Sequence, residues 1–280
     1  MSQYIHDTGS FEGTGGLKIH FQFFKPKKYK GVIIYVHDRG EHSGRYIYLI
    51  EHFIDKGFAF YGLDHRGNGK SEGKRGHIDN MDDYINDLWT FINIVKKREE
   101  DKKFFILGHS MGGLIGIRLV EEHVDMVDGV IVTSSALKLK KRVPKFRKFV
   151  GEKLSNSWPK FSMKNVIDPI YLSHDKDVVK KYMEDEMVHN RITSRFFTEM
   201  INAMEIAMEK AEKVEVPFLI LHAGSDEISD PDGSMEFYEK LGSQDKKLII
   251  YDGFYHEILN EVDRQVVFKD IGKWLKPRVS

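Results

Sequence analysis

The chain has 280 residues, 41% of them hydrophobic and 31% charged, which is the composition of an ordinary globular protein. Its 43 basic and 43 acidic residues give a formal net charge of zero, so the molecule as a whole is not built to attract nucleic acid. There is no cysteine, which excludes disulfides, thiolate metal sites and a cysteine nucleophile. The length is sufficient for one domain with an insertion or for two domains.

The N-terminal segment Met1–Asp7 has neither the basic region nor the apolar region of a secretory signal. No uninterrupted apolar stretch approaches the roughly 20 residues that a helix needs to cross a bilayer. We therefore expect an intracellular, cytoplasmic protein, and the lack of cysteine fits such a reducing compartment.

Apolar, β-rich runs recur along the chain with helical spacers between them. The first run alternates with period two and follows the glycine-rich turn Glu12–Gly16, which favours an antiparallel hairpin at a sheet edge. The central runs are nearly continuous in apolar residues, as in parallel strands that are buried on both faces. The predicted strands are Leu17–Phe24, Val32–His37, Phe58–Asp64, Phe104–Gly108, Val130–Thr133, Phe218–His222 and Leu248–Tyr251.

Amphipathic stretches with the apolar spacing of helices alternate with these strands. This alternation predicts a doubly wound α/β domain, with a mostly parallel central sheet and helices on both faces. The predicted helices are Tyr46–Lys56, Met81–Arg98, Leu114–His123, Ser234–Leu241 and Arg264–Leu275.

The strand–helix rhythm breaks after Ala136, and no strand is expected from there to Val214. We interpret residues 137–213 as a helical cap, inserted between core parts 1–136 and 214–280, that covers a site at the carboxyl ends of the strands. The segment is rich in large apolar side chains, and we expect about a third of them to face a cavity while the others form its own small core. These side chains are Met163, Met183, Met187, Met200, Met204, Met208, Phe146, Phe149, Trp158, Phe161, Phe196 and Phe197.

Within the predicted cap, Lys138–Lys153 carries eight basic residues and one acidic residue, interleaved with Phe146, Phe149 and Val150. Such a basic amphipathic pattern can lie on an anionic lipid surface. The alternative is a solvated basic face. The sequence therefore leaves contact of the cap with a membrane or a micelle open.

The motif Gly108-His109-Ser110-Met111-Gly112 stands where a predicted buried strand ends and a helical segment begins. A serine there needs a sharp, strained strand-to-helix turn that lifts its hydroxyl clear of the sheet, and the flanking glycines let neighbouring backbone approach. The N-terminus of the following helix would aim free N–H groups at the serine, which suits an oxyanion. Ser110 is therefore the predicted nucleophile.

A serine nucleophile needs a base within hydrogen-bond reach and a carboxylate that orients the base. His256 lies in the loop after the last predicted strand and before the final helix, which places it at the carboxyl edge of the sheet and makes it the predicted base. The other histidines after Ser110 lie on the serine's own helix, in the cap or inside a strand (His123, His174, His189 and His222).

The orienting acid is expected at the end of the preceding strand, and Asp226 closes a tight turn there. Glu227, Asp230 and Asp232 are alternatives in the same loop. Asp230 and Asp232 flank Pro231 and have the positions of an N-cap and a first-turn residue of the next helix. Asp226 is therefore the predicted acid.

Together these motifs resemble the monoacylglycerol lipase and lysophospholipase group of α/β-hydrolases, a group that also contains proteins called serine aminopeptidases. The resemblance implies an α/β-hydrolase fold with a helical cap insertion. The cap itself matches weakly, through Arg191–Phe196. The matching stretches occur in both halves of the core and in the same order, at His37–Tyr46, Asp64–Gly73, Gly108–Gly113, Gly224–Ile228 and His256–Glu261.

The resemblance also implies an oxyanion hole made by two backbone N–H groups, those of Met111 and Arg39. Each such donor is typically worth about 3–4 kcal/mol of transition-state stabilisation. The sequence departs from the family here, because His37-Asp38-Arg39 replaces a histidine and glycine followed by a small or apolar residue. Asp38 restricts backbone that must present a donor, so the geometry of this loop is the part of the site that the resemblance predicts least well.

These residues predict a serine carboxylic-ester hydrolase that acts through an acyl-enzyme and needs no cofactor and no metal. The apolar cap favours lipid esters with medium-to-long acyl chains, such as monoacylglycerols or lysophospholipids. One alternative is an amidase or aminopeptidase, which would have an acidic pocket for a substrate ammonium. Another is a non-catalytic binding protein on a hydrolase scaffold, which the departure at Asp38 and Arg39 would suit.

Overall fold

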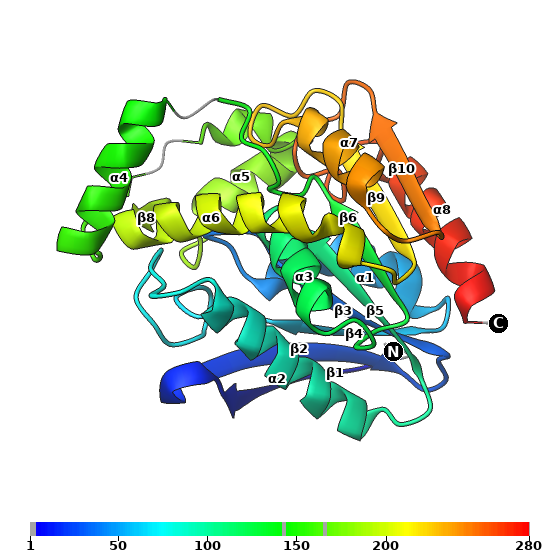
Figure 1. Ribbon diagram of the computed structural model, residues 1–280. Coiled ribbons are helices and arrows are strands. Elements are labelled where there is room, and N and C mark those ends of the chain that lie inside the picture. The colour runs from blue at the N-terminus through cyan, green and yellow to red at the C-terminus, as the bar shows by residue number, and fades with distance from the viewer. Residues whose placement is uncertain (1–3, 142–143, 165–166, 280) are drawn as a thin grey trace.

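An eight-stranded sheet forms the centre of the computed structural model, which describes residues 4–141, 144–164 and 167–279 (Figure 1). The strands lie in the order β1-β2-β4-β3-β5-β6-β9-β10. Their bounds are β1 (Tyr4–Glu12), β2 (Lys18–Pro26), β3 (Gly31–Val36), β4 (Phe58–Leu63), β5 (Lys103–His109), β6 (Gly129–Thr133), β9 (Phe218–Ala223) and β10 (Lys246–Tyr251).

Six of these strands, from β4 to β10 in the sheet order, pair in parallel. The other two form an antiparallel hairpin at the edge, where β1 pairs with β2 and β2 pairs with β4. The predicted edge hairpin is thus confirmed, and so is the mostly parallel sheet. Parallel strands end at a common edge, which is where the loops after β3, β5, β9 and β10 meet.

Helices cover both faces of the sheet, which confirms the doubly wound prediction. Side chains alternate along each strand, so in β3 Val32 and Ile34 join the core on one face while Ile33 and Tyr35 join the core on the other. The first face is covered by α2 (Asp82–Arg98), α3 (Met111–Glu122) and α7 (Pro231–Lys240), and the second by α1 (Ile47–Ile54) and α8 (Arg264–Leu275). Short 3₁₀ segments are Thr14–Gly16, Ser43–Tyr46, Pro169–Tyr171, Ala211–Lys213 and Lys276–Arg278.

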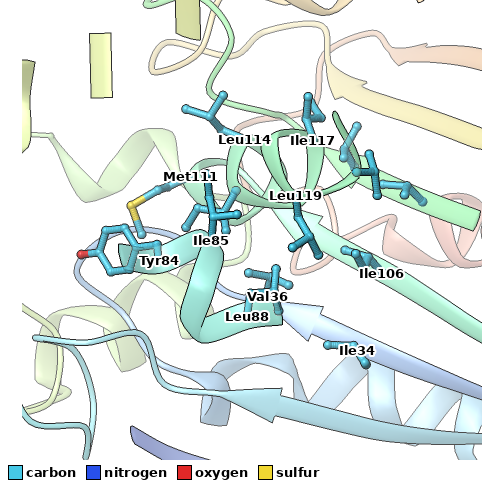
Figure 2. Close-up of a cluster of buried hydrophobic side chains, with 14 of the residues drawn as sticks. Ile34, Val36, Tyr84, Ile85, Leu88, Ile106, Met111, Leu114, Ile117 and Leu119 are labelled. Carbon is cyan, nitrogen blue, oxygen red and sulfur yellow. The ribbon is translucent and has the colours of Figure 1, made fainter. Parts of the chain in front are cut away.

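The core between the sheet, α2 and α3 fixes the helix that starts at the predicted nucleophile. Figure 2 shows Leu114, Ile117 and Leu119 of α3 with Leu88 of α2 and Ile106 of β5, and all are fully buried. Because each side chain of this size contributes about 1.5–3 kcal/mol on burial, the start of α3 is held firmly against the sheet.

The segment between β6 and β9 lies at the upper left of Figure 1 and is mostly helical, as predicted. It contains α4 (Lys145–Ser157), α5 (Lys176–Glu184) and α6 (Ser194–Lys210). The prediction that it has no strand is wrong, because β7 (Ser162–Lys164) and β8 (Arg191–Thr193) form an antiparallel pair. Each is only three residues long; β7 is exposed, and in β8 only Arg191 is exposed while Ile192 is half-buried and Thr193 is buried. Neither strand is long enough to leave an apolar pattern in the sequence.

Backbone hydrogen bonds join this segment to loops at the carboxyl edge of the sheet. His189 N donates to Gly40 O at 2.8 Å, and Glu257 N donates to Leu172 O at 2.8 Å. Arg142 of the basic run lies outside the described residues. Among the residues that are described, none of the helices is both long enough and apolar enough to span a membrane.

Candidate active site

Ser110 occupies a strained turn between β5 and α3. Its φ of 51° and ψ of −114° lie outside the regions that ordinary residues adopt. The turn also needs its glycines, since a Cβ on Gly108 would lie 2.5 Å from Gly112 O and a Cβ on Gly112 would lie 2.1 Å from Val36 O. The strain is held by the packed core behind it, and a strained serine of this kind is typical of functional sites.

His256 lies fully buried in the loop after β10 and is held by a carboxylate. Its Nδ1 lies 2.7 Å from Asp226 Oδ2, while its Nε2 has no hydrogen-bond partner among the described residues. The ring lies near the turn, with its centroid 4.8 Å from that of His109, the residue before Ser110. The predicted nucleophile, base and acid are thus brought to one edge of the sheet.

Asp226 is fixed from both sides. Its Oδ1 accepts from the N–H groups of Ile228 at 2.8 Å and Ser229 at 3.0 Å, while Oδ2 faces His256. Burial alone would raise the pKa of this carboxyl, but the charge of His256 and hydrogen bonds from His256 and His222 hold the pKa far below its usual range. Asp226 is therefore an anion at all ordinary pH values.

Among the described residues, the other carboxylates predicted as alternatives in this loop form no hydrogen bond or ion pair with His256. Asp230 is the N-cap of α7 and its side chain accepts from Asp232 N at 3.3 Å, which confirms the interpretation of Asp230 as a cap. Glu227 is exposed.

A buried ion network ties the loop after β3 to the loop that carries His256. Arg45 donates to both carboxylate oxygens of Glu257, at 2.7 and 2.8 Å, and also to Glu41. Glu41 in turn accepts from the backbone N–H of Asp38 at 2.9 Å. This network was not predicted from the sequence, because the pairing of Arg45 with Glu257 spans 212 residues and only the four-residue spacing of Glu41 and Arg45 is a local signal.

The departure at Asp38 changes the expected oxyanion hole. Asp38 Oδ1 accepts a hydrogen bond from Met111 N at 3.1 Å, and its Oδ2 lies 4.0 Å from His256 Nε2. The N–H group of Met111, which the resemblance predicts to bind the substrate's carbonyl oxygen, is therefore occupied by a carboxylate oxygen of Asp38. The sequence marked Asp38 as unusual, but a contact across 73 residues could not be inferred from it.

Asp38 also acts on the charge of the predicted base. Burial lowers the pKa of His256, but the charge and hydrogen bond of Asp226, followed by the charge of Asp38, outweigh it and raise the pKa to about 9. In this arrangement His256 is protonated at neutral pH and would have to lose its proton before it could act as a base.

A cavity of about 540 Å³ lies beside the site. Arg39 lines it next to Asp38, and Glu227 and Ile228 line it next to Asp226. The remaining wall is largely apolar and includes four of the twelve large side chains singled out from the sequence, which confirms that about a third of them face a cavity. The four are Phe196, Phe197, Met200 and Met204.

A buried, strained serine on this sheet, with a carboxylate-bound histidine near it, defines the class: the chain is an α/β-hydrolase, and within it a serine hydrolase of carboxylic esters. The protein-family model described as serine aminopeptidase, S33, matches residues 27–263, and the chain belongs to this family. The predicted fold, family resemblance and enzyme class are confirmed.

Relatives cover nearly the whole chain. A monoacylglycerol lipase of Mycolicibacterium smegmatis is 29% identical over 95% of this chain and 95% of its own length. The crystal structure of a monoacylglycerol lipase from Paleococcus ferrophilus is 33% identical, with a TM-score of 0.81, and covers 99% of this chain and 100% of that one. An uncharacterised abhydrolase domain-containing protein of Dictyostelium discoideum is 33% identical over 88% of this chain, which spans only 26% of that longer protein.

The pKa of His256 predicts the pH dependence of hydrolysis. Because the reaction needs the neutral imidazole, kcat/KM should rise with pH and level off above about 9. Asp38→Asn removes an anion 4.0 Å from His256 Nε2, so it should lower the pKa of His256. The rising limb of the kcat/KM profile should then lie about one pH unit lower. The measurement is kcat/KM from pH 6 to about 10.

The control is Glu227→Gln, which removes an exposed carboxylate from the loop of Asp226 and should leave the limb in place. A limb at the same pH in the wild type and in Asp38→Asn would show that Asp38 does not control the protonation of His256.

Proposed function

We propose that the chain hydrolyses carboxylic esters of lipids, with Ser110, His256 and Asp226 as its catalytic triad. Ser110 Oγ attacks the ester carbonyl while His256 Nε2 takes the hydroxyl proton, and Asp226 holds the imidazole through Nδ1. His256 then gives the proton to the leaving alcohol, and water releases the acyl group from Ser110 by the same steps. The bond of 2.7 Å between His256 and Asp226, at the end of the loop after β10, is the observation that carries this proposal.

The negative oxygen of the tetrahedral intermediate is proposed to bind the N–H groups of Met111 and Arg39. The amide of Met111 is held by Asp38, so the substrate's carbonyl has to displace that carboxylate before attack. A hydrogen bond to a charged group contributes about 1.5–3 kcal/mol, and the displacement therefore lowers the rate.

We propose that residues 137–213 act as a cap that receives the acyl chain. The cavity volume of about 540 Å³ falls within the range of about 300–1,000 Å³ found for small-molecule sites, and its apolar wall comes mainly from α6. This supports a medium-to-long acyl chain, as in a monoacylglycerol or a lysophospholipid.

The polar end of the same cavity suits a polar headgroup. Arg39 lines it, and Arg39 Nη1 is buried without a hydrogen-bond partner among the described residues. Guanidinium groups bind phosphate and hydroxyl oxygens well. An amide substrate with a free ammonium is supported less, because Asp168 and Glu227 in the wall are matched by Arg39 and Lys141 and the pocket is not acidic overall.

We further propose that the protein works from the cytoplasm at a lipid surface, through α4. Phe146 and Phe149 on this helix are 74% and 53% exposed, and Val150 beside them is 44% exposed. The part of this helix from Lys145 to Lys153 also belongs to the basic run Lys138–Lys153. Exposed aromatic side chains with basic residues around them are the combination that binds anionic lipid surfaces.

Substitution of the triad tests the reaction. Ser110→Ala and His256→Ala should each lower kcat on monoacylglycerols and p-nitrophenyl esters by about 10⁶-fold, because the first removes the nucleophile and the second removes the base that activates it. Asp226→Asn should cost about 10⁴-fold through the wrong imidazole tautomer. A fluorophosphonate probe should label the wild type but not Ser110→Ala.

The matched control is Asp230→Asn, since Asp230 caps α7 in the same loop and should change kcat little. Turnover retained by Ser110→Ala would contradict the reaction, and absence of probe labelling in the wild type would favour the non-catalytic alternative.

The substitution Asp38→Gly tests whether Asp38 competes with the substrate for the N–H group of Met111. Removal of the carboxylate frees Met111 N, and kcat/KM should rise about 10- to 100-fold, measured above the acid limb of the pH profile so that the charge of His256 does not contribute. An unchanged or lower rate, with the fold intact by circular dichroism, would show that Asp38 does not compete with the substrate.

Vesicle sedimentation tests the surface of α4. The double variant Phe146→Ser/Phe149→Ser should bind vesicles of phosphatidylcholine and phosphatidylserine at least about 10-fold more weakly, because two exposed aromatic side chains no longer enter the interface. Ile5→Ser/Val262→Ser removes two side chains that are 63% and 59% exposed elsewhere, and should bind like the wild type. Equal binding by both double variants would refute the assignment to α4.

A further inference from the structure

Three side chains converge beside Ser110, and the proposed mechanism uses only one of them as a base. One ligand atom each from Asp38, His109 and His256 lies within 4.8 Å of the other two. The three residues come from the loop after β3, the end of β5 and the loop after β10. His109 is 4% exposed and His256 is fully buried.

Both histidines direct Nε2 toward the same space, and His256 Nε2 offers a lone pair once the protonated ring has lost the proton on that atom. His109 Nδ1 lies 3.1 Å from Thr133 O, a carbonyl that can only accept, and 3.0 Å from the Thr133 hydroxyl oxygen, which can donate or accept. A hydrogen on Nδ1 satisfies the carbonyl and leaves the lone pair of the neutral ring on Nε2. His256 Nδ1 faces the Asp226 carboxylate in the same way. The two Nε2 atoms are buried and have no hydrogen-bond partner among the described residues.

This pattern is that of histidines prepared to bind a metal ion. Metal-binding histidines almost always donate the other ring N–H to a carboxylate or a backbone carbonyl. Here His256 Nδ1 faces the Asp226 carboxylate and His109 Nδ1 faces the backbone carbonyl of Thr133. The Asp38 carboxylate adds an anionic oxygen, with Oδ2 4.0 Å from His256 Nε2 while Oδ1 is held by Met111 N. Two imidazoles and one carboxylate are a ligand set of catalytic zinc sites, with a fourth position left for water.

The distances require only a small contraction. Ligand atoms on a tetrahedral zinc ion are about 3.3 Å apart, given bonds of about 2.0–2.1 Å, so each atom of the cluster has to move by about 1 Å or less. Asp38 lies on a loop and its side chain is 19% exposed, which leaves it free to make this adjustment.

We propose that Asp38, His109 and His256 form an inhibitory site for Zn²⁺. The ion forms bonds to Nε2 of both histidines and to Oδ2 of Asp38, and any proton on His256 Nε2 is released to solvent. Because the lone pair that should accept the Ser110 proton is then bound to the metal, ester hydrolysis stops until the ion leaves. The inhibition rests on the proposed role of His256 as base, whereas the binding of the ion does not.

Binding is measured directly on Ser110→Ala, which keeps all three ligands and has no turnover. Isothermal titration with ZnCl₂ should give one equivalent bound, and Co²⁺ should give the visible absorption bands of a tetrahedral site. Asp38→Asn in the Ser110→Ala background should weaken binding at least about 10-fold, as should His109→Asn, whose amide can still donate to Thr133 O. His123→Asn, at the far end of α3, should leave the affinity unchanged.

Inhibition is measured on the wild type with a p-nitrophenyl ester and with the fluorophosphonate probe. Zn²⁺ should block both turnover and labelling, EDTA should restore both, and Mg²⁺ should have no effect because it avoids imidazole ligands. Relative to its own zinc-free rate, Asp38→Asn should need at least about 10-fold more Zn²⁺ for half inhibition.

The two proposals fail in different ways. An inactive wild type whose Ser110→Ala form still binds Zn²⁺ through Asp38 and His109 would refute the hydrolase mechanism and support the metal site. An active wild type whose Zn²⁺ affinity is unaffected by Asp38→Asn and His109→Asn would refute the metal site and leave the hydrolase mechanism intact.

Discussion

The close packing of backbone around Ser110 is the constraint on which the rest of the site depends. Gly108, Gly112 and Val36 approach so closely that a single added Cβ at either glycine would lie within 2.5 Å of a carbonyl oxygen. This contact joins β3, β5 and α3 and keeps Ser110 at a positive φ of 51°. The strain is stored locally and is offset by the apolar core beneath α3 (Figure 2).

Two carboxylates flank the histidine that lies near the Ser110 turn. His256 faces the Asp226 carboxylate on one side and the Asp38 carboxylate on the other, at 2.7 and 4.0 Å. Asp226 is hydrogen-bonded to the ring, whereas Asp38 both engages the Met111 amide and stabilises a positive His256. With Asp38 in the loop after β3, the resting site is polar and its Met111 amide is already occupied.

Sequence reasoning was strongest where the signal was local. The final helix was predicted with its observed bounds, Arg264–Leu275, and the turn at Ser110 followed from a motif placed between a strand and a helix. It failed for β7 and β8, which are three residues long and held by pairing with each other rather than by an apolar pattern. The hydrogen bond from Met111 to Asp38 could not be predicted from the sequence either, because the two residues are brought together by the pairing of β3 with β5 in the sheet.

The bidentate pairing of Arg45 with Glu257 has a consequence for the order of assembly. The turn at Ser110 and the loop after β3 belong to the first half of the chain, but His256 and the partner of Arg45 come from near its end. Contacts so distant along the chain form late in folding because their loops are costly to close. During synthesis the site around Ser110 is therefore incomplete, and the chain can hydrolyse esters only once its last strand and helix have docked.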